Sequence, residues 1–522
     1  MEDLNPVSNL WRLIRTGATF QRTGALDYAM RQFGAPGSLR ITAKVLMWPV
    51  QWLGERGDPA QPPVVRAITA LGPSYIKFGQ ILSTRPDVTG PELSRELKIL
   101  QDKLPPFPMD AARREVEREL GAPVEALFIE FSQPVAAASI AQVHRARRAD
   151  TGEEVAVKIR RPGIARAFDR DIQAFYFVAR TIELLAPKAR RLKPTQVIAH
   201  FHGVVKQELD FRLEASAAAE FGANVEKDEG FRIPQVIWPL SSETVLTSQW
   251  VSGTQMGDLE GLRASGIDMK AMGARVVQVF LNHALRDGYF HADMHQGNLK
   301  VGPDGDLIAL DFGIMGRIDA YTRRVFAEIV YGFLRQNYRR VAEVHFEAGY
   351  VPPDRDIDEF AQALRTVAEP IFGQDASRIS MAKLLAHLFD VTERFGMETQ
   401  TQLILLQRTM VVVEGVGRSL DPHMNMWQVA RPVVERYIRD NLGPRAVARD
   451  LAETVRILSR FGPLLPRMAE AALIRTNNPV EDEDDPQARR RSRRRGRAAW
   501  ALAGMAMGAA IALTSVWLAQ AL

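Results

Sequence analysis

The stretch from Gly288 to Gly313 holds three side chains whose types and spacing suit metal and phosphate chemistry. Asp293 is followed, after four residues, by Asn298, and Asp311 begins the tripeptide Asp-Phe-Gly further along the chain. Two carboxylates and an amide oxygen form a hard-oxygen donor set. Such a set suits Mg²⁺, which takes few protein ligands and keeps several waters. The competing interpretation is a surface hairpin whose acids are only solvated.

A hairpin would bring these side chains together. Asn298 opens a short apolar run, a Pro-Asp-Gly turn signal follows at 303–305, and a second apolar run leads to Asp311. Two strands joined by this turn place Asn298 and Asp311 at the same end, with Asp293 on the preceding loop. The spacing is typical of protein kinases, in which the first Asp takes or orients the proton of the nucleophile. The Asn and the second Asp hold the metal ions there.

A lysine suited to nucleotide phosphates ends the strand-like run Val155–Lys158. Strands are predicted at 128–131, 140–146 and 154–159, an order that is typical of the N-terminal lobe of a kinase. An unpaired lysine on an edge strand is the alternative. Its position upstream of the Asp-Phe-Gly hairpin favours the nucleotide interpretation for Lys158.

A helix should supply an acidic partner for Lys158. The helical pattern of residues 195–226 contains three candidates, Glu208, Asp210 and Glu214. Any one of them could instead lie on a solvated acidic face. The residues alone do not choose among the three.

The loop between the first two strands is rich in alanine: Ala136, Ala137, Ala138 and Ser139. Kinases place glycines here, because glycine adopts positive φ and lets the backbone approach the phosphates. Since positive φ is costly for alanine, we expect a stiffer loop with a different arrangement of amides. This composition argues against ordinary protein-kinase activity but not against nucleotide binding.

Composition bounds the class of protein. The 522 residues are 46% hydrophobic, which allows a sizeable core, and the absence of cysteine excludes disulfides and thiolate metal sites. The net charge of +5 is smaller than the seven arginines between Arg489 and Arg497, so the rest of the chain is slightly acidic. A nucleic-acid-binding main domain would carry a basic stripe, and we therefore expect no nucleic-acid partner.

The regions around this centre are predicted to be mostly helical. Ile41–Leu53 is an apolar run with two tryptophans, too short to span a bilayer. It either lies on the membrane surface or packs on the body of the protein. A helix is expected at 110–120 with Asp110 as its N-cap, and helices are expected from 254 to about 470 apart from the hairpin. Two more strands, at 233–238 and 244–247, and a hinge at 250–253 complete the expected fold.

The C-terminal tail predicts a membrane anchor. Residues 476–497 read as a charged linker, and residues 498–522 contain no charged side chain. A helix of this length spans roughly 37 Å, enough to cross a hydrocarbon core of ~30 Å. The preceding arginines place the main domain in the cytoplasm by the positive-inside rule. Gly504 and Gly508 form a G-x-x-x-G pattern, which leaves a homodimer as an option.

Taken together, these motifs resemble one family, the UbiB family of atypical protein-kinase-like ATPases. The match covers roughly residues 65–320, and its combination of motifs is highly specific. It departs from the usual pattern at Ala141, Met294 and Gln296. The residues that carry the resemblance are Lys77 and Gln80 of a K-x-G-Q motif, the alanine loop, Lys158, Glu208, Asp210, Glu214, Asp293, Asn298 and Asp311.

The resemblance implies an α+β, bilobal protein-kinase-like fold with a helical N-terminal extension and a C-terminal transmembrane helix. Lys77 and Gln80 would lie on the extension and block protein substrates, Glu208 and Asp210 would stabilise it, and Glu214 would pair with Lys158. Asp293 would be catalytic, the alanine loop would contact nucleotide, and Asn298 and Asp311 would hold the metal. The implied domains are an extension (1–110), an N-lobe (111–252), a C-lobe (253–475), the linker and the anchor.

The implied activity is binding and hydrolysis of Mg-ATP in support of ubiquinone biosynthesis at the inner membrane. Membrane lipids, quinone precursors and other enzymes of that pathway are the implied partners. Two alternatives stay open: a small-molecule or lipid kinase acting on a prenylated phenol, and a nucleotide-gated lipid-binding scaffold.

Overall fold

The computed structural model describes residues 6–442 apart from seven gaps. The gaps are 33–36, 84–88, 101–104, 186–192, 373–386, 389–390 and 398–400. The expected linker (476–497) and anchor (498–522) lie outside the described residues. Within residues 6–442, leaving out those gaps, no helix is long and apolar enough to cross a bilayer.

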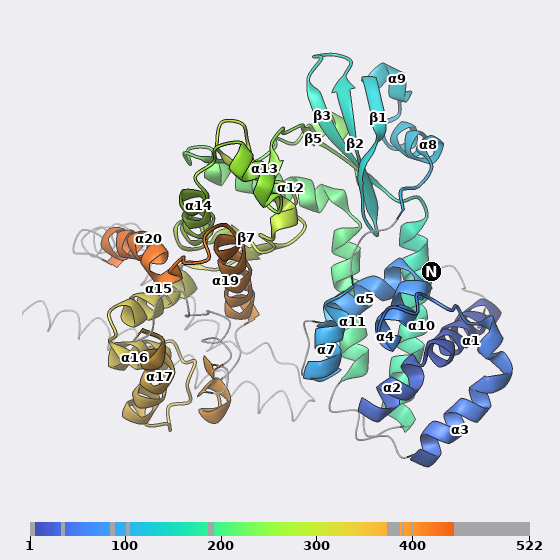
Figure 1. Cartoon of the computed structure of the whole chain (residues 1–522), viewed down its shortest axis with the longest axis horizontal. Coiled ribbons are helices and arrows are strands. Elements are labelled where there is room, and N and C mark those ends of the chain that lie inside the picture. The colour runs from blue at the N-terminus through green and yellow to red at the C-terminus, as the bar shows by residue number, and fades with distance from the viewer. Residues whose placement is uncertain are drawn as a thin grey trace, which may run out of the picture. The chain divides into compact units, whose positions relative to one another are not determined.

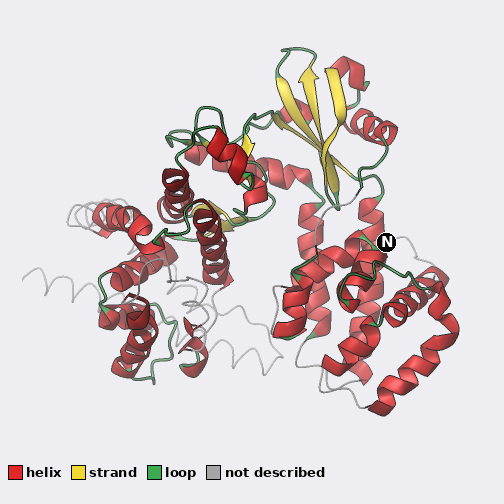
Figure 2. Ribbon diagram, viewed as in Figure 1, coloured by secondary structure: helices red, strands yellow, loops and turns green. Residues whose placement is uncertain are grey.

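A four-stranded antiparallel sheet forms the N-terminal lobe, in the order β1-β2-β3-β5 (Figures 1 and 2). Its strands are β1 (Phe128–Ala137), β2 (Ala141–Arg148), β3 (Glu154–Arg160) and β5 (Val245–Gln249). These confirm the strands expected at 128–131, 140–146, 154–159 and 244–247. The strand expected at 233–238 is wrong, because only Val236 forms a β-bridge and Trp238–Leu240 is a 3₁₀ turn.

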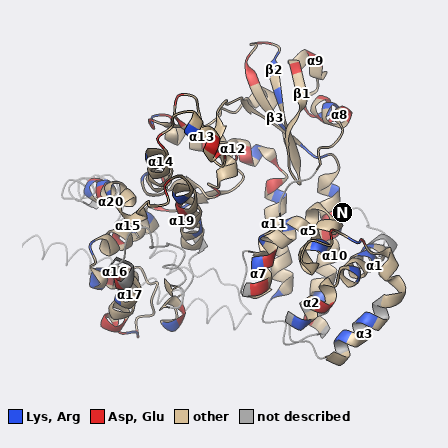
Figure 3. Ribbon diagram, viewed as in Figure 1, with Lys and Arg blue, Asp and Glu red and all other residues tan. Residues whose placement is uncertain are grey.

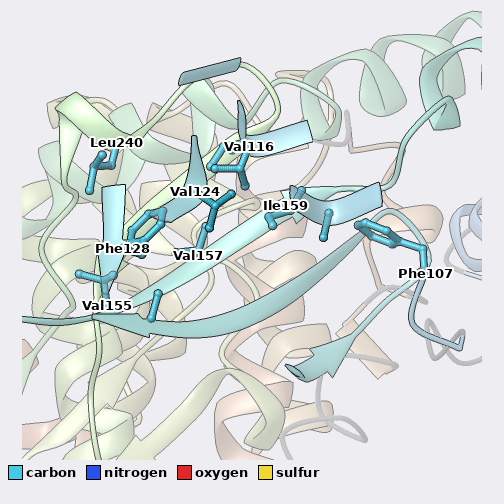
Figure 4. Packing of buried hydrophobic residues seen from close by; sticks show 11 residues of the cluster. Phe107, Val116, Val124, Phe128, Val155, Val157, Ile159 and Leu240 are labelled. Carbon is cyan, nitrogen blue, oxygen red and sulfur yellow. The ribbon is translucent and has the colours of Figure 1, made fainter. Parts of the chain in front are cut away.

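Side chains along β3 alternate between the buried core and the opposite face of the sheet. Val155, Val157 and Ile159 point into a buried cluster, so Lys158 faces the opposite side of the sheet. Figure 4 shows this cluster, to which Phe107 and residues of α8 (Met109–Leu120) also contribute. The prediction of Asp110 as N-cap is wrong: Pro108 takes that position, and the Asp110 carboxylate pairs with Arg114.

Two long helices lie between β3 and β5, and their packing as a pair was not predicted. They are α10 (Ile164–Leu185) and α11 (Pro194–Glu208), which pack on each other through Phe168, Phe201 and their neighbours. The chain then breaks at Leu209-Asp210 and continues as α12 (Phe211–Val225). The single helical pattern predicted at 195–226 is therefore two helices, because the Asp210 side chain caps α12 by accepting from the Arg212 amide.

The N-terminal extension is a helical layer with its own apolar core. It contains α1 (Pro6–Thr23), α2 (Ala25–Gln32), α3 (Gly37–Met47), η1 (Trp48–Leu53), α4 (Pro63–Leu71), α5 (Pro73–Ser83) and α7 (Pro91–Leu97). Val65, Ile68 and Leu97 are buried in this core, and Phe175 of α10 packs against it. Tyr75 and Phe78 of α5 contact the Phe175 ring, with ring centroids 4.9 and 5.0 Å apart. The extension is thus held on α10.

The C-terminal lobe is mainly helical, with small strands around the catalytic segment. The helices are α13 (Leu259–Ala264), α14 (Met269–Asn282), α15 (Ala320–Leu334), α16 (Tyr338–Glu347), α17 (Ile357–Phe372), α19 (Thr401–Leu420) and α20 (Met426–Leu442). The expected hairpin is present as β8 (Leu299–Val301) and β9 (Leu307–Ala309). The prediction of no other strand was wrong, since β6 (Thr254–Gln255) extends the hairpin and β7 (Tyr289–His291) pairs with β10 (Met315–Arg317).

Candidate active site

Lys158, Glu214 and Asp311 meet in one charged cluster. The Lys158 Nζ donates to both carboxylate oxygens of Glu214, at 2.7 and 2.9 Å, and to Asp311 Oδ2 at 3.1 Å. Glu214 lies in the first turn of α12, so the cap at Asp210 also fixes its position. Of the three acidic candidates, Glu214 is the one that pairs with Lys158.

The cluster has two carboxylates for one ammonium group. Burial opposes the charge of Lys158, but the carboxylates of Asp311 and Glu214 outweigh it and raise the lysine pKa. Burial raises the pKa of Glu214, and Lys158 only partly offsets this. For Asp311, Lys158 and the Gly313 amide overcome burial and hold the pKa at about 2. The ionised Asp311 carboxylate is therefore the group in this cluster that favours a cation.

Residues 292–298, which we call the catalytic loop after the expected role of Asp293, hold Asp293 and Asn298 together. The Asn298 Nδ2 donates to the Asp293 carbonyl at 3.1 Å and to its Oδ2 at 3.3 Å. The Leu310 amide donates to the Asn298 carbonyl, which ties this loop to the segment that leads into Asp311. Because the Asn298 nitrogen serves Asp293, its amide oxygen is the atom left to face a cation.

His291 is a buried structural partner of this loop. It is 1% exposed, and its Nδ1 accepts from the Asp293 amide at 3.1 Å. Burial lowers its pKa against the opposing effect of the Asp311 and Asp293 carboxylates. A neutral imidazole that accepts at Nδ1 orients the loop and is not placed as a base. Its ring also packs against Phe312, with centroids 5.5 Å apart.

Two hydrogen bonds join α19 to the catalytic loop. Sequence reasoning missed both. The Thr409 Oγ1 donates to the Ala292 carbonyl at 3.1 Å, and the Gln296 Nε2 donates to Ser419 Oγ at 2.7 Å. Both pairs join residues more than a hundred positions apart, and no local motif marks them. Thr409 and Ser419 therefore hold Ala292 and Gln296, which stand on either side of Asp293 in the chain.

The alanine segment occupies the end of β1 and the turn into β2. Ala136 and Ala137 are strand residues paired with Val143 and Gln142, so the loop itself is only 138–140. Among the described residues, only Lys193 and Gln336 have positive φ without being glycine. The expected cost of positive φ at these alanines is therefore not incurred.

A partly buried cation, Arg161, contacts this turn. Its guanidinium donates to the carbonyls of Pro105 and Ala138, and its backbone amide donates to the Ile140 carbonyl. Burial lowers its pKa. The neighbouring Ser139 side chain is 1% exposed. Arg161 was not predicted, yet it joins the segment after the extension to the alanine turn.

Of the two K-x-G-Q residues, Lys77 contacts a helix that carries one of the acids, and Gln80 contacts the chain after α7. The Lys77 Nζ lies 2.8 Å from Glu208 Oε1, and the Gln80 Nε2 donates to the Leu100 carbonyl at 3.4 Å. Glu208 thus ties α11 to α5 of the extension. The described contacts of Asp210 are with Arg212 instead, so Asp210 serves the extension only by ending α11 and starting α12.

The Lys77–Glu208 pair should hold the extension closed. Its side chains are 16% and 14% exposed, so a double-mutant cycle with Lys77→Met and Glu208→Gln should give a coupling of about 1–2 kcal/mol for local opening. Hydrogen exchange of the α5 amides measures this opening. The Arg114–Asp110 pair is equally short but exposed, and it should couple much more weakly. Equal coupling in the two pairs would contradict a locking role.

Comparison with known proteins identifies the family of this chain. The chain matches the ABC1 atypical kinase-like domain over residues 99–345 and the UbiB helical domain over residues 364–425. The probable protein kinase UbiB of Aeromonas hydrophila is 40% identical over 459 residues, covering 87% of this chain and 84% of the relative. The Vibrio cholerae protein of the same name is 41% identical over 417 residues, covering 79% and 77%. The chain belongs to the UbiB family.

A solved structure shares the fold of this UbiB family member. The complex of Rv3197 with erythromycin from Mycobacterium tuberculosis matches with a TM-score of 0.50 at 25% identity. The match covers 63% of this chain and 83% of that one. The fold is therefore a mostly helical α+β fold of the protein-kinase type, and the protein is a kinase- or ATPase-type enzyme. Family membership is consistent with a role in ubiquinone biosynthesis.

The donor set suits a divalent cation that prefers oxygen ligands. No cluster of three or more His, Asp or Glu side chains that could hold a metal occurs within the described parts of residues 6–442. A cation here would rest on Asp311 and the Asn298 oxygen and would complete its shell with water and phosphate oxygens. Mg²⁺ binds in this way, whereas Ca²⁺ takes more protein oxygens.

Proposed function

We propose that the protein binds Mg-ATP at Lys158 and Asp311 and hydrolyses it in support of ubiquinone biosynthesis. The observation that carries the proposal is the Lys158 Nζ held between Glu214 and Asp311. This arrangement presents the ammonium to phosphate oxygens, while Asn298 and Asp311 would hold the metal. The bound Mg²⁺ would neutralise charge on the phosphates. Asp293 would orient the attacking hydroxyl or water and accept its proton.

A small-molecule or lipid acceptor, such as a prenylated phenol, is the second candidate for the transferred phosphoryl group. This candidate requires that the extension, which the Lys77–Glu208 contact ties to α11, restrict the access of polypeptides to the site. A nucleotide-gated lipid-binding scaffold is a third candidate. The complete set of Asp293, Asn298 and Asp311 favours an enzyme over a scaffold.

Product analysis tests the proposal. Purified full-length protein is incubated with ATP labelled at the terminal phosphate, Mg²⁺ and a membrane lipid extract. Label in inorganic phosphate supports hydrolysis, and label in the lipid fraction supports the lipid-kinase alternative. Label that stays in ATP throughout would contradict both and favour the scaffold. Other enzymes of the pathway and a second copy of the chain are further proposed partners.

We also propose that residues 498–522 anchor the protein in the inner membrane with the enzyme domain in the cytoplasm. The support is the uncharged run of 25 residues preceded by seven arginines. Deletion of 489–522 should move the protein from the membrane pellet to the supernatant in an alkaline carbonate wash. Carbonate strips peripheral contacts, so a truncated protein that stays in the pellet would contradict this anchor.

A further inference from the structure

The end of α3 and the following η1 turn expose an apolar face. Ile41, Val45, Trp48 and Trp52 have exposed fractions of 67%, 67%, 69% and 71%. We call these four side chains the tryptophan face. The first three follow one another at spacings of four and three, which places them on one side of a helix. Single exposed apolar residues are normal, but four such side chains within twelve positions need an explanation.

The opposite side of this segment is fixed to the extension. Gly54 lies directly against the backbone of α1: a Cβ added there would come within 2.3 Å of the Ala18 carbonyl carbon. Arg22 Nη1 donates to the carbonyls of Trp52, at 3.1 Å, and Gly54, at 2.7 Å. At the other end, Arg40 Nε donates to Asp27 of α2 at 2.9 Å. The tryptophan face is therefore held outward by a packed support.

The charged residues within α3 and η1 all have one sign. Helix α3 and η1 contain Arg40 and Lys44 but no Asp or Glu (Figure 3). Lys44 is exposed one position before Val45, and Arg56 is exposed just after η1. The polar edge of Trp52 is satisfied within the segment, because its Nε1 donates to the Pro49 carbonyl at 2.9 Å. The nearest acids, Asp27 and Glu55, are each paired with an arginine. Exposed aromatic side chains next to the exposed Lys44 match an anionic surface.

We propose that the tryptophan face docks on the surface of an anionic lipid bilayer. The apolar side chains would enter the headgroup boundary to a depth of about 5–10 Å, and Lys44 would meet lipid phosphates. A bilayer fits better than a protein partner because tryptophan prefers the membrane interface and because α3 and η1 carry basic residues and no acids. The proposal rests on the membrane location proposed above but adds a second contact, made by the N-terminal extension.

The absence of cysteine makes a direct test possible. Full-length Val45→Cys, labelled with an environment-sensitive fluorophore, is placed in vesicles of phosphatidylethanolamine and phosphatidylglycerol. Its emission should shift to the blue, lipid-borne spin labels should quench it, and aqueous iodide should not. The control is Thr151→Cys in the exposed β2–β3 turn, whose label should stay open to iodide.

Two further variants test the contributions of charge and of tryptophan. Lys44→Gln in the labelled protein should lower the ratio of docked to undocked label by about fivefold, since one cation near an anionic surface contributes about that factor. Trp48→Ala with Trp52→Ala should abolish protection from iodide. Trp238→Ala, at an exposed tryptophan outside the extension, should leave protection unchanged.

Three results would overturn the proposal. The first is equal iodide quenching of the Val45 label with and without vesicles. The second is protection that is the same in neutral phosphatidylcholine vesicles and rises with protein concentration, which would indicate a second copy. The third is full protection in detergent without lipid, which would indicate another segment of this chain. The carbonate wash tests the C-terminal anchor separately. The anchor and the docking of the tryptophan face can therefore be disproved independently.

Discussion

Asp311→Asn should weaken binding of Mg-ATP by about 100-fold or more. Loss of a partner outside the ligand shell alone weakens metal sites by about 10- to 100-fold, and Asp311 is proposed as a direct ligand. Without Mg²⁺, the same substitution should leave ATP affinity unchanged or increase it. The variant lacks a carboxylate that repels phosphate, and Glu214 is then the one acidic partner of Lys158 in this cluster. Titration calorimetry with Mg-ATP and with ATP in chelator measures both effects.

The effect of Asp311 should not depend on pH near neutrality. Because Lys158 and the Gly313 amide hold its pKa at about 2, the carboxylate is ionised from pH 6 to pH 8. The ratio of wild-type to variant affinity should therefore be constant over that range. Asp304→Asn removes the same charge at the other end of the hairpin and should leave Mg-ATP binding unchanged. A folded Asp311→Asn protein with wild-type Mg-ATP affinity would remove the metal assignment.

Asp293→Asn should lower kcat by about 10²- to 10⁴-fold while nucleotide affinity changes little. The Asp293 carboxylate lies against the Asn298 amide, and the described contacts of Lys158 go to Glu214 and Asp311 instead. Loss of Asp293 should therefore affect proton transfer and not phosphate binding. Steady-state kinetics combined with nucleotide titration separates the two effects.

A structural role for Asp293 would give a different result. The Asp293 amide donates to His291, and its carbonyl accepts from Asn298, so these backbone contacts survive the substitution. The hairpin variant Asp304→Asn is the matched control, because its carboxylate is exposed and pairs with Arg232 and not with the loop that holds Asp293. If Asp293→Asn lost activity and affinity in parallel while the control kept both, Asp293 would be only a structural residue of the loop.

Local patterns predicted the elements that position the candidate site. The hairpin and the strand that ends in Val155–Lys158 were found because turn residues and alternating apolar positions report structure within a few residues. Glu214 could not be chosen from the residues alone, since Glu208 and Asp210 share the same helical pattern. The choice depends on Asp210 as an N-cap that ends one helix and begins the next.

What sequence reasoning missed involves contacts between distant segments. Thr409 and Ser419 contact the catalytic loop from α19, and Phe175 of α10 joins the extension to the lobe. Each has an ordinary helical neighbourhood with no local sign of its partner. The strand expected at 233–238 failed for a related reason: apolar residues there pack as a turn under β5 and form only one bridge.

The most direct test of the central claim is release of terminal phosphate from Mg-ATP by the full-length protein in lipid vesicles. Wild type, Asp293→Asn, Asp311→Asn and the hairpin control Asp304→Asn are measured side by side. We predict release by wild type and by Asp304→Asn that stops when Mg²⁺ is chelated, and none above background in the other two variants. Phosphate release that survives in both Asp293→Asn and Asp311→Asn would contradict the assignment of this site.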